Sequence, residues 1–473
     1  MEILGFEVPL WTILLTVFGI WLYKFLYSGF DVFAKRGIRT VKPIYPFVGN
    51  LWGIWKKDIR KWQEENVRRY GKFFGFYDGK TPLLYVSDPE VIKEIFVKKF
   101  DCFADHKLFS FGLDQNKYIR KFLFVINGEG WKEARSAVTP AFSSGKIKKM
   151  SSIMVECCDR MVESSRSVTK GSGIIELKDF FGKVTLDVIA RCAFGTKLDN
   201  LDDPNNPFAV NSAKAFRPSL FDSGWSLIPE LFPWTQIFGL EALISRDSIE
   251  FFVKTVEEVI KSRKADGSIG KRGDFLDVLL EEAEAEKANR AKDPNAKIVL
   301  DEEVLISQCV TFFAAGYDTV GTQLAMAGHY LALYPECQEK LHEELKIERG
   351  CTKSCEIKGL KFERGDTVVF PMWTIHHTEE YHPDPNTFDP ERFAPENKSK
   401  LVPYTYFPFG QGPRICIGMR FASEQSKLSL GHLILSFKLS RCSKTSHPPK
   451  YEGNRIISMP KDLFVKIEER VEE

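Results

Sequence analysis

One cysteine near the carboxy-terminal end of the chain lies in a stretch suited to a metal ligand. The stretch reads Phe409-Gly410-Gln411-Gly412-Pro413-Arg414-Ile415-Cys416-Ile417-Gly418. Its glycines and proline allow the backbone to turn tightly and to come close to a flat group. Backbone N–H groups around a cysteine so placed can hold it as a thiolate, which is the form that binds metal. The stretch therefore predicts a ligand loop.

The neighbours of Cys416 add to this prediction. Arg414 carries a fixed charge in a fork that suits a carboxylate, and Phe409 is an apolar lid that limits water around the sulfur. The residues from Met419 to Phe437 predict a helix, so that the cysteine lies just before a positive helix end. A buried structural cysteine is the alternative, since the chain has 10 cysteines. The spacing F-G-x-G-x-R-x-C-x-G favours the ligand loop.

A second motif lies on a long predicted helix that begins at Asp301-Glu302-Glu303 and ends at Leu333. Its first turn is acidic, as the helix dipole favours. The motif reads Ala314-Ala315-Gly316-Tyr317-Asp318-Thr319. Its small residues let a flat cofactor and a small ligand approach the backbone, Thr319 can hydrogen-bond a carbonyl one turn back, and Asp318 could pass protons inward from water. Ordinary helix packing with a surface acid is the alternative, and the presence of the cysteine loop favours the functional interpretation.

A third pattern places Trp131 and Arg135 one helical turn apart. On a helix the two side chains share a face and offer an indole N–H and a guanidinium to one anion. Alone, the pattern W-x-x-x-R is more typical of an amphipathic surface. Its place upstream of the cysteine loop favours a binding role.

Together these motifs resemble those of the cytochrome P450 family. The cysteine loop is similar to the family's haem-binding loop, and A-G-x-D-T is similar to its oxygen-activating helix. The stretches Pro403 to Pro408 and Ile417 to Ala422 resemble the microsomal drug- and steroid-oxidising clan related to family 3. The resemblance implies a mainly α fold with small β-sheets, and haem b held by Cys416 as a thiolate.

The resemblance also implies roles for the other candidate residues. Arg414, Trp131 and Arg135 would bind haem propionates, while Asp318 and Thr319 would deliver protons to dioxygen. The remaining residues expected at the cofactor are Phe409, Gly410, Gly418, Ala315 and Gly316. The implied activity is monooxygenation of a small apolar substrate such as a steroid, fatty acid or xenobiotic.

Electrons would come from the membrane-bound NADPH–cytochrome P450 reductase, with cytochrome b5 as a further candidate partner. The reductase would dock near the cysteine, where Lys132, Arg420 and Lys427 could contribute positive charge. A net charge of +2 and the absence of a basic run with interleaved aromatic residues give no indication of nucleic-acid binding. The scattered cysteines suggest reduced thiols in a cytosol-facing protein.

One part of the family pattern is missing. The K helix with its Glu-x-x-Arg should lie between the helix Pro335 to Lys346 and the stretch that begins at Ile347, which predicts an internal deletion near residues 346–347. The matches Glu65–Arg68 and Glu163–Arg166 lie far upstream and are chance matches. The arginine of P-E-R-F, Arg392, would lose its usual partners, and a buried unpaired charge costs about 3–5 kcal/mol.

This gap leaves two rival functions open. The first is a non-catalytic pseudoenzyme, or the product of a splice form or defective gene model, with weak haem binding. The second is a haem-thiolate isomerase or dehydratase that needs no reductase, against which the Asp318-Thr319 pair argues. Cys351 and Cys355 have no second Cys/His pair at matching spacing for a structural zinc. His376, His377 and His382 are expected at the surface or in hydrogen bonds.

The amino-terminal stretch predicts a membrane anchor. Val8 to Tyr23 is uncharged and mostly apolar, and with Lys24 snorkelling about twenty residues can span a bilayer core. Acidic residues precede the stretch and basic residues follow it, which places the body of the protein in the cytosol. A cleaved signal peptide is the alternative, but the start is acidic and no A-x-A-like site follows. We therefore expect a single-pass protein of the endoplasmic reticulum membrane.

The domain organisation follows from this anchor. Residues 1–27 form the anchor, residues 28–50 a basic, proline-rich hinge, and residues 51–473 the internally truncated catalytic domain. Within it, an aromatic loop could line the substrate site through Phe109, Phe111, Phe122 and Phe124. The Phe/Trp-rich stretch Pro207 to Leu243 could roof that site and dip into the membrane interface, although ordinary core and loop positions explain it about as well.

Overall fold

The computed structural model describes residues 2–3, 6–7, 10–46, 48–54, 58–106, 116–198, 203, 205–215, 245–294, 297, 299–344, 367–453 and 458–470. The described chain is mainly helical with small β-sheets, as predicted. Its α-helices are α1 (Leu10–Tyr27), α2 (Val32–Lys35), α3 (Leu51–Ile54), α4 (Ile59–Tyr70), α5 (Pro89–Lys93), α6 (Gly128–Val138), α7 (Ser144–Thr169), α8 (Leu177–Phe194), α9 (Pro207–Ala215), α11 (Arg246–Asp266), α12 (Phe275–Lys292), α13 (Glu302–Leu333), α14 (Pro335–Glu344), α15 (Met372–His376) and α16 (Met419–Ser436). A π-helical turn, η1 (Glu94–Lys98), follows α5.

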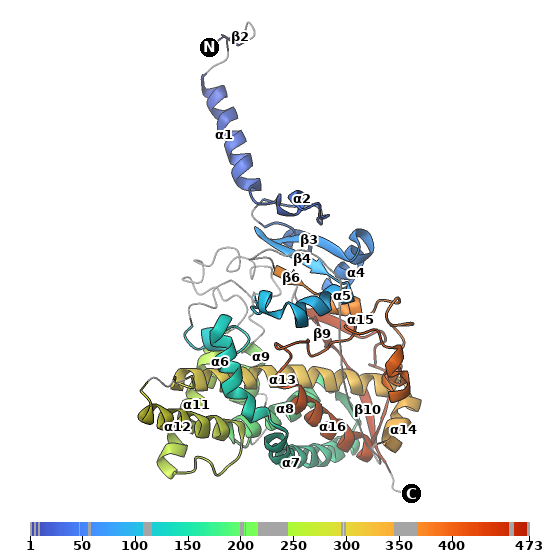
Figure 1. Ribbon diagram of the computed structural model, residues 1–473. Coiled ribbons are helices and arrows are strands. Elements are labelled where there is room, and N and C mark those ends of the chain that lie inside the picture. Colours follow the sequence, from blue (N-terminus) through green and yellow to red (C-terminus); the bar gives the residue numbers. More distant parts are fainter. Residues whose placement is uncertain are drawn as a thin grey trace.

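Helix α13 is the axis of the fold and crosses the molecule in Figure 1. It begins where the acidic first turn predicts, because the Asp301 side chain accepts a hydrogen bond from the N–H of Val304 at 2.7 Å. Helix α8 packs along it. Three glycines of α13 permit this approach: a Cβ on Gly316, Gly321 or Gly328 would meet side-chain atoms of α8 at 2.7–3.3 Å. The central part of α13 is therefore fixed against α8.

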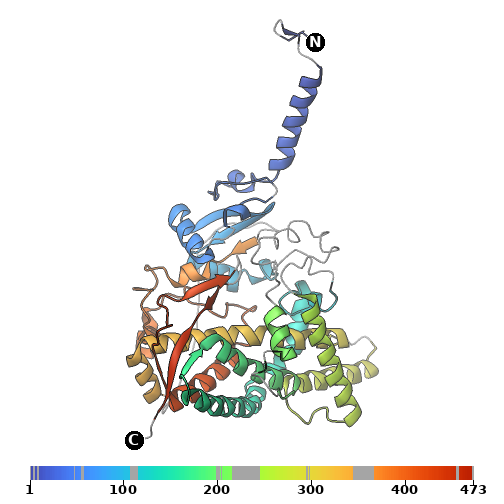
Figure 2. The same cartoon turned by 180° about the vertical axis from the view of Figure 1, so that it is seen from behind.

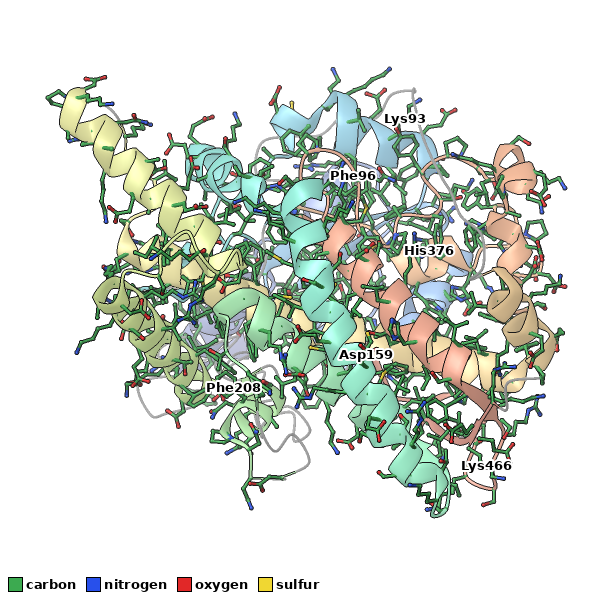
Figure 3. All side chains as sticks on the ribbon, turned by 90° about the horizontal axis from the view of Figure 1, so that it is seen from below. Lys93, Phe96, Asp159, Phe208, His376 and Lys466 are labelled. Atoms are coloured by element: carbon green, nitrogen blue, oxygen red, sulfur yellow. The ribbon has the colours of Figure 1, made fainter. Side chains whose placement is uncertain are left out.

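Helices α7 and α16 lie side by side beneath α13, as Figure 3 shows from below. Between them, Nδ1 of His432 lies 3.3 Å from a carboxylate oxygen of Asp159, and the thiol of Cys158 lies 3.7 Å from the Ser429 hydroxyl. The cysteine loop leads directly into α16. Helix α16 is thereby fixed against α7, and it also packs against α13.

Small sheets join distant parts of the chain. Strand β10 (Phe464–Glu469) lies between β5 (Ile174–Glu176) and β7 (Phe437–Ser440), antiparallel to both, and Figure 2 shows β5 beside the carboxy-terminal strands. Strand β3 (Phe73–Asp78) forms a hairpin with β4 (Thr81–Val86), and β6 (Thr367–Val369) adds to β4 in parallel. Two further pairs are β1 (Glu2–Ile3) with β2 (Phe6–Glu7), and β8 (Lys450–Gly453) with β9 (Ser458–Lys461).

Much of the predicted hinge, residues 28–50, packs against the sheet of β3, β4 and β6. Phe33 is buried on Gly75 of β3, where a Cβ would lie within 2.3–2.8 Å of the Phe33 ring. The side chain of Asn50 donates to the carbonyl oxygens of Val41 and Pro43 and accepts from the N–H of Tyr77. The packed body of the protein therefore includes residues of the 28–50 stretch.

Helix α1 projects from the body in Figure 1. Its apolar side chains are largely exposed, with Trp11, Leu14 and Leu15 60–62% exposed. No helix among the described residues has both the length and the hydropathy to cross a membrane. The transmembrane span expected within residues 1–27 stays a prediction.

Candidate active site

The sulfur of Cys416 lies at the amino-terminal end of α16. The residue is exposed, and the backbone N–H of Met419 donates to its carbonyl oxygen at 3.4 Å. Nearby protein atoms still desolvate the sulfur, and this desolvation raises the pKa of Cys416. The N–H of Gly418, the charge of Arg135 and the N–H of Met419 act in the opposite direction. These groups favour the thiolate, and an electron-pair acceptor such as a metal would favour it further.

The loop before Cys416 needs its glycines for two different reasons. Gly410 and Gly412 both have a φ of 73°, a conformation that costs other residues about 1–2 kcal/mol. A Cβ on Gly410 would meet nothing within 4 Å, whereas a Cβ on Gly412 would lie 1.9 Å from the carbonyl oxygen of Phe96 in η1. Gly412 is thus where the loop presses on η1. The N–H of Cys416 donates to the carbonyl of Phe409 at 2.9 Å and closes the turn.

Arg414 of the cysteine loop and Trp131 of α6 meet in the structure. The guanidinium carbon of Arg414 lies 3.8 Å from the centre of the Trp131 ring, in a cation–π contact. The Arg414 side chain is 6% exposed, and its Nη1 is buried without a hydrogen-bond partner among the described residues. Burial lowers the pKa of Arg414 to about 10, which Asp105 opposes. A buried cationic group with one unused donor fits a carboxylate ligand.

Three residues that sequence analysis did not single out complete the surroundings of Arg414. Its Nη2 lies 4.0 Å from Asp105 and 3.4 Å from the side-chain oxygen of Asn127, which also accepts from the N–H of His106 at 3.0 Å. The Nδ1 of His106 is buried without a partner among the described residues. Burial, and then the charge of Arg414, lower the pKa of His106 to about 4. The residues lie in a loop of no regular period, so no sequence signal marked them.

Arg135 contacts the cysteine loop itself. Its Nη2 donates to the carbonyl oxygen of Ile415 at 2.9 Å. Burial lowers the pKa of Arg135, and the nearby Cys416 opposes that shift. In this structure Arg135 therefore holds the backbone beside Cys416 and stabilises negative charge on the sulfur, which adds a role to the predicted one.

On α13, Ala315 and Thr319 are exposed, while Ala314 and Val320 beside them are buried. The hydroxyl of Thr319 donates to the carbonyl of Ala315 at 2.6 Å, so the hydrogen bond predicted one turn back is confirmed. The helix stays α-helical through this point. Ala315 and Thr319 thus form one small, accessible patch of backbone and hydroxyl in the middle of a buried helix.

Gly316 has a different position from the one expected. A Cβ on Gly316 would lie 2.7 Å from a side-chain carbon of Ile189 on α8. The contact between α13 and α8 therefore explains why residue 316 is a glycine. Ala315 is the small residue on the accessible face of α13. The sequence alone does not distinguish a small helix residue that faces a cofactor from one that faces another helix.

Asp318 forms an ion pair beside Thr319. One of its carboxylate oxygens lies 3.4 Å from the Nζ of Lys178 on α8, with side chains 24% and 18% exposed, respectively. The carboxylate is therefore in reach of both water and the interior. This position suits a group that accepts a proton on one side and passes it on at the other.

Several other predictions have mixed outcomes. Phe122 is buried in the core and Phe124 is half-buried against it, whereas Phe109 and Phe111, much of the stretch 207–243 and the junction at 346–347 lie outside the described residues. The expectation for Arg392 was wrong: it is half-buried and donates to the carbonyl oxygens of Pro383 and Asp384. A solvated guanidinium with two acceptors does not carry the cost of an unpaired buried charge.

The donor set fits a flat metal cofactor that carries carboxylates. Cys416 offers a sulfur for the metal, and Arg414 offers an unused charged donor for a carboxylate. Ala315 and Thr319 leave a helix backbone accessible. Among the described residues, no group of three or more His, Cys, Asp and Glu side chains could hold a metal ion by itself. The site therefore suits an iron porphyrin with one protein ligand.

Comparison with protein-family models matches Cytochrome P450 over residues 40–346 and 345–467. Similar proteins include Cytochrome P450 3A16 of Mus musculus, 32% identical over 500 residues with 96% of each chain covered. Cytochrome P450 3A29 of Sus scrofa is 32% identical over 503 residues, with 98% of this chain and 97% of the relative covered. Cytochrome P450 3A12 of Canis lupus familiaris is 31% identical over 506 residues, with 98% of each chain covered.

The two family segments meet where sequence analysis places the gap. The first segment ends at residue 346 and the second begins at residue 345. An alignment of 500 positions also exceeds the 473 residues of the chain. The family matches on both sides of this point, and the alignments cover nearly all of each relative. The rest of the family's sequence pattern is therefore present in the chain. The chain belongs to the cytochrome P450 family, the haem-dependent monooxygenases.

Proposed function

We propose that the protein inserts one oxygen atom of O₂ into a small apolar substrate, with electrons supplied by an NADPH-dependent reductase. The observation that carries the proposal is the Cys416 thiol, exposed at a helix amino terminus, where the N–H groups of Gly418 and Met419 and the charge of Arg135 act to lower its pKa. When bound, haem b supplies the binding and reductive activation of dioxygen. The protein supplies the ligand, the proton path and the exclusion of water.

Different residues are proposed to bind the iron of the cofactor and to bind its carboxylates. Cys416 binds the iron as thiolate, with Arg135 and the amides of Gly418 and Met419 stabilising its charge. Arg414, stacked on Trp131, would bind a propionate, since its Nη1 has no partner among the described residues. His106 offers a further nitrogen beside Arg414. Phe409, half-buried at the start of the turn, limits water around the sulfur, and Gly410 and Gly418 give the turn its shape.

Proton delivery is assigned to Asp318 and Thr319. Asp318 exchanges protons with water while its ion pair with Lys178 holds the carboxylate in place. The Thr319 hydroxyl donates to the Ala315 carbonyl and is exposed beside it, so it can turn to donate to a ligand. The hydroxyl would then receive a proton from the side of Asp318.

Changing these two residues should separate electron use from product formation. We expect Asp318→Asn to lower kcat about 10²-fold, as loss of a general acid commonly does. Thr319→Ala should lower the product formed per NADPH consumed, because electrons still arrive while protons are misdirected. The measurement is NADPH oxidation against product in a reconstituted system. Thr311→Ala is the matched control, since Thr311 makes the same bond to a carbonyl, of Ser307, in the same helix but is buried. Equal coupling in Thr319→Ala and wild type would contradict the assignment.

The surface around the cysteine suits a negatively charged redox partner. Lys132, Arg420 and Lys427 are exposed on α6 and α16, the two helices that flank the loop. Lys132 forms only a surface pair with Glu129 at 2.8 Å. Surface positive charge of this kind accelerates encounter with an acidic partner. We propose the NADPH–cytochrome P450 reductase as that partner, and cytochrome b5 as a second electron donor.

We also propose that α1 attaches the protein to the endoplasmic reticulum membrane, with the catalytic domain in the cytosol. The support is the row of exposed apolar side chains on α1 and the basic residues that follow it in the sequence. Alkaline extraction of membranes would separate an inserted helix from one bound at the surface. Recovery of the full chain in the soluble fraction without extraction would refute the attachment.

The test of the proposed activity is optical. The reduced protein with carbon monoxide should show the Soret band of a thiolate-ligated haem, and NADPH-dependent turnover should follow on addition of reductase. The band without any NADPH-dependent oxidation would favour the haem-thiolate isomerase. No haem band at all would favour the non-catalytic alternative.

That non-catalytic alternative has one observation in its favour, the division of the family match into two segments at residues 345–346. We expect a chain with a K helix restored between residues 346 and 347 to retain more haem and to unfold at higher urea. Even two apolar side chains buried by the new helix would add about 3–6 kcal/mol. The measurement is haem per protein and the free energy of unfolding of both chains. Equal, stable haem content in both would show that the chain does not need the helix.

A further inference from the structure

Two histidines hold the segment that leads into the cysteine loop. Thr405 and Phe407 are 0% and 1% exposed. The Nε2 of His382 lies 3.1 Å from the carbonyl oxygen of Thr405, and the Nε2 of His376 lies 3.1 Å from the backbone nitrogen of Phe407. One histidine therefore contacts the backbone on each side of Tyr406.

The two contacts require opposite tautomers. A carbonyl oxygen can only accept, so His382 donates from Nε2. A backbone N–H can only donate, so the Nε2 of His376 carries the lone pair and accepts. Burial, and then the nearby His382 and His377, lower the pKa of His376 to about 4. An imidazolium has no acceptor, and the depressed pKa keeps this one available at neutral pH.

The contact at Phe407 is passed on to the sulfur by two further backbone bonds. The carbonyl of Phe407 accepts from the N–H of Gly410 at 2.9 Å, and the carbonyl of Phe409 accepts from the N–H of Cys416 at 2.9 Å. The position of the Phe407 backbone thus determines where the turn begins, and the turn determines where Cys416 lies.

The ring of Phe407 also lies between two other rings. It meets the ring of His376 edge-on at 5.2 Å and the ring of Phe96 at 5.7 Å. Figure 3 labels Phe96 and His376 near the amino-terminal end of α16. Phe96 also presents its carbonyl to Gly412. The loop is therefore set between η1 on one side and the end of α15 on the other.

We propose that His376 is a positioning residue for Cys416, acting as an obligate hydrogen-bond acceptor for the Phe407 N–H. The inference rests on the proposed haem-thiolate function and adds a residue that touches neither cofactor nor substrate. Its specific content is the acceptor at the position of Nε2. A residue that only filled space would need the volume of the ring and no hydrogen-bond acceptor.

The test compares two amide variants. In His376→Gln the side-chain oxygen reaches about as far as Nε2 and can accept, whereas in His376→Asn it reaches only the position of Nδ1. Hydrogen–deuterium exchange of the full chain should show the amides of residues 405–418 exchanging about tenfold faster in the Asn variant and near wild-type rates in the Gln variant. His377→Asn is the control, because His377 contacts the Trp373 carbonyl and is expected to leave the loop unchanged.

The second measurement is the thiolate-type band of the reduced, carbon-monoxide-bound protein. The fraction of haem with that band should fall in the Asn variant and be rescued in the Gln variant. Equal exchange and equal bands in Asn, Gln and wild type would overturn the inference, and so would a Gln variant as impaired as Asn in both. Faster exchange in Asn alone, with no thiolate band in any protein including wild type, would uphold the positioning role and reject the haem-thiolate function.

Discussion

Cys416→Ser should abolish the thiolate-type Soret band and all NADPH-dependent turnover. A serine hydroxyl does not ionise near neutral pH, so the amides of Gly418 and Met419 and the charge of Arg135 would have no thiolate to stabilise. The expected loss is complete for the band, because the band reports the bond between sulfur and iron. The measurement is the difference spectrum of the reduced protein with carbon monoxide, together with haem content.

Cys102→Ser is the matched control, since Cys102 is also exposed but lies outside the loop. It should keep both the band and the turnover. A thiolate-type band that survives Cys416→Ser and disappears in another cysteine variant would show that a different sulfur is the ligand, and the assignment of the whole site would fall with it.

Gly412→Ala should destabilise the protein far more than Gly410→Ala, although both glycines have a φ of 73°. The shared backbone conformation costs an alanine about 1–2 kcal/mol. At position 412 the new methyl group would also meet the carbonyl oxygen of Phe96, and such overpacking adds about 1–3 kcal/mol. The sum approaches the low end of a domain's stability of about 5–15 kcal/mol. We expect Gly412→Ala to lose haem and Gly410→Ala to retain most of it.

The measurement is the free energy of unfolding in urea for both variants, with the thiolate-type band followed in parallel. The comparison removes the backbone term, because it is common to the two positions. Equal losses of stability would mean that the approach of η1 to the loop does not constrain the cysteine.

The sequence predicted the elements of the site better than their contacts. The helix over 302–333 and the helix after Cys416 are confirmed, because caps and the spacing of glycines are local signals. The bond from Thr319 to Ala315 is confirmed for the same reason, since it joins residues one turn apart.

Contacts between distant segments gave no such signal. Nothing in W-x-x-x-R indicates that Arg414 stacks on Trp131 while Arg135 turns to the Ile415 carbonyl. Gly316 was assigned to the cofactor, an assignment that stays a prediction, and nothing in the sequence indicated that a Cβ there would meet Ile189 of α8. Arg392 was expected to lose its usual partners and stay a buried unpaired charge, but it donates to two backbone carbonyl oxygens. In each case the partner lies on another element, and side-chain type alone does not determine which one.

The sheet of β5, β10 and β7 has a consequence for synthesis of the chain. Its middle strand, Phe464–Glu469, is also the last strand of the described chain. At about 5–20 residues per second, the ribosome makes β5 some tens of seconds before β10 exists to pair with it. This sheet can therefore close only after β10 has been made, and a nascent chain stalled before Phe464 should still need chaperone protection.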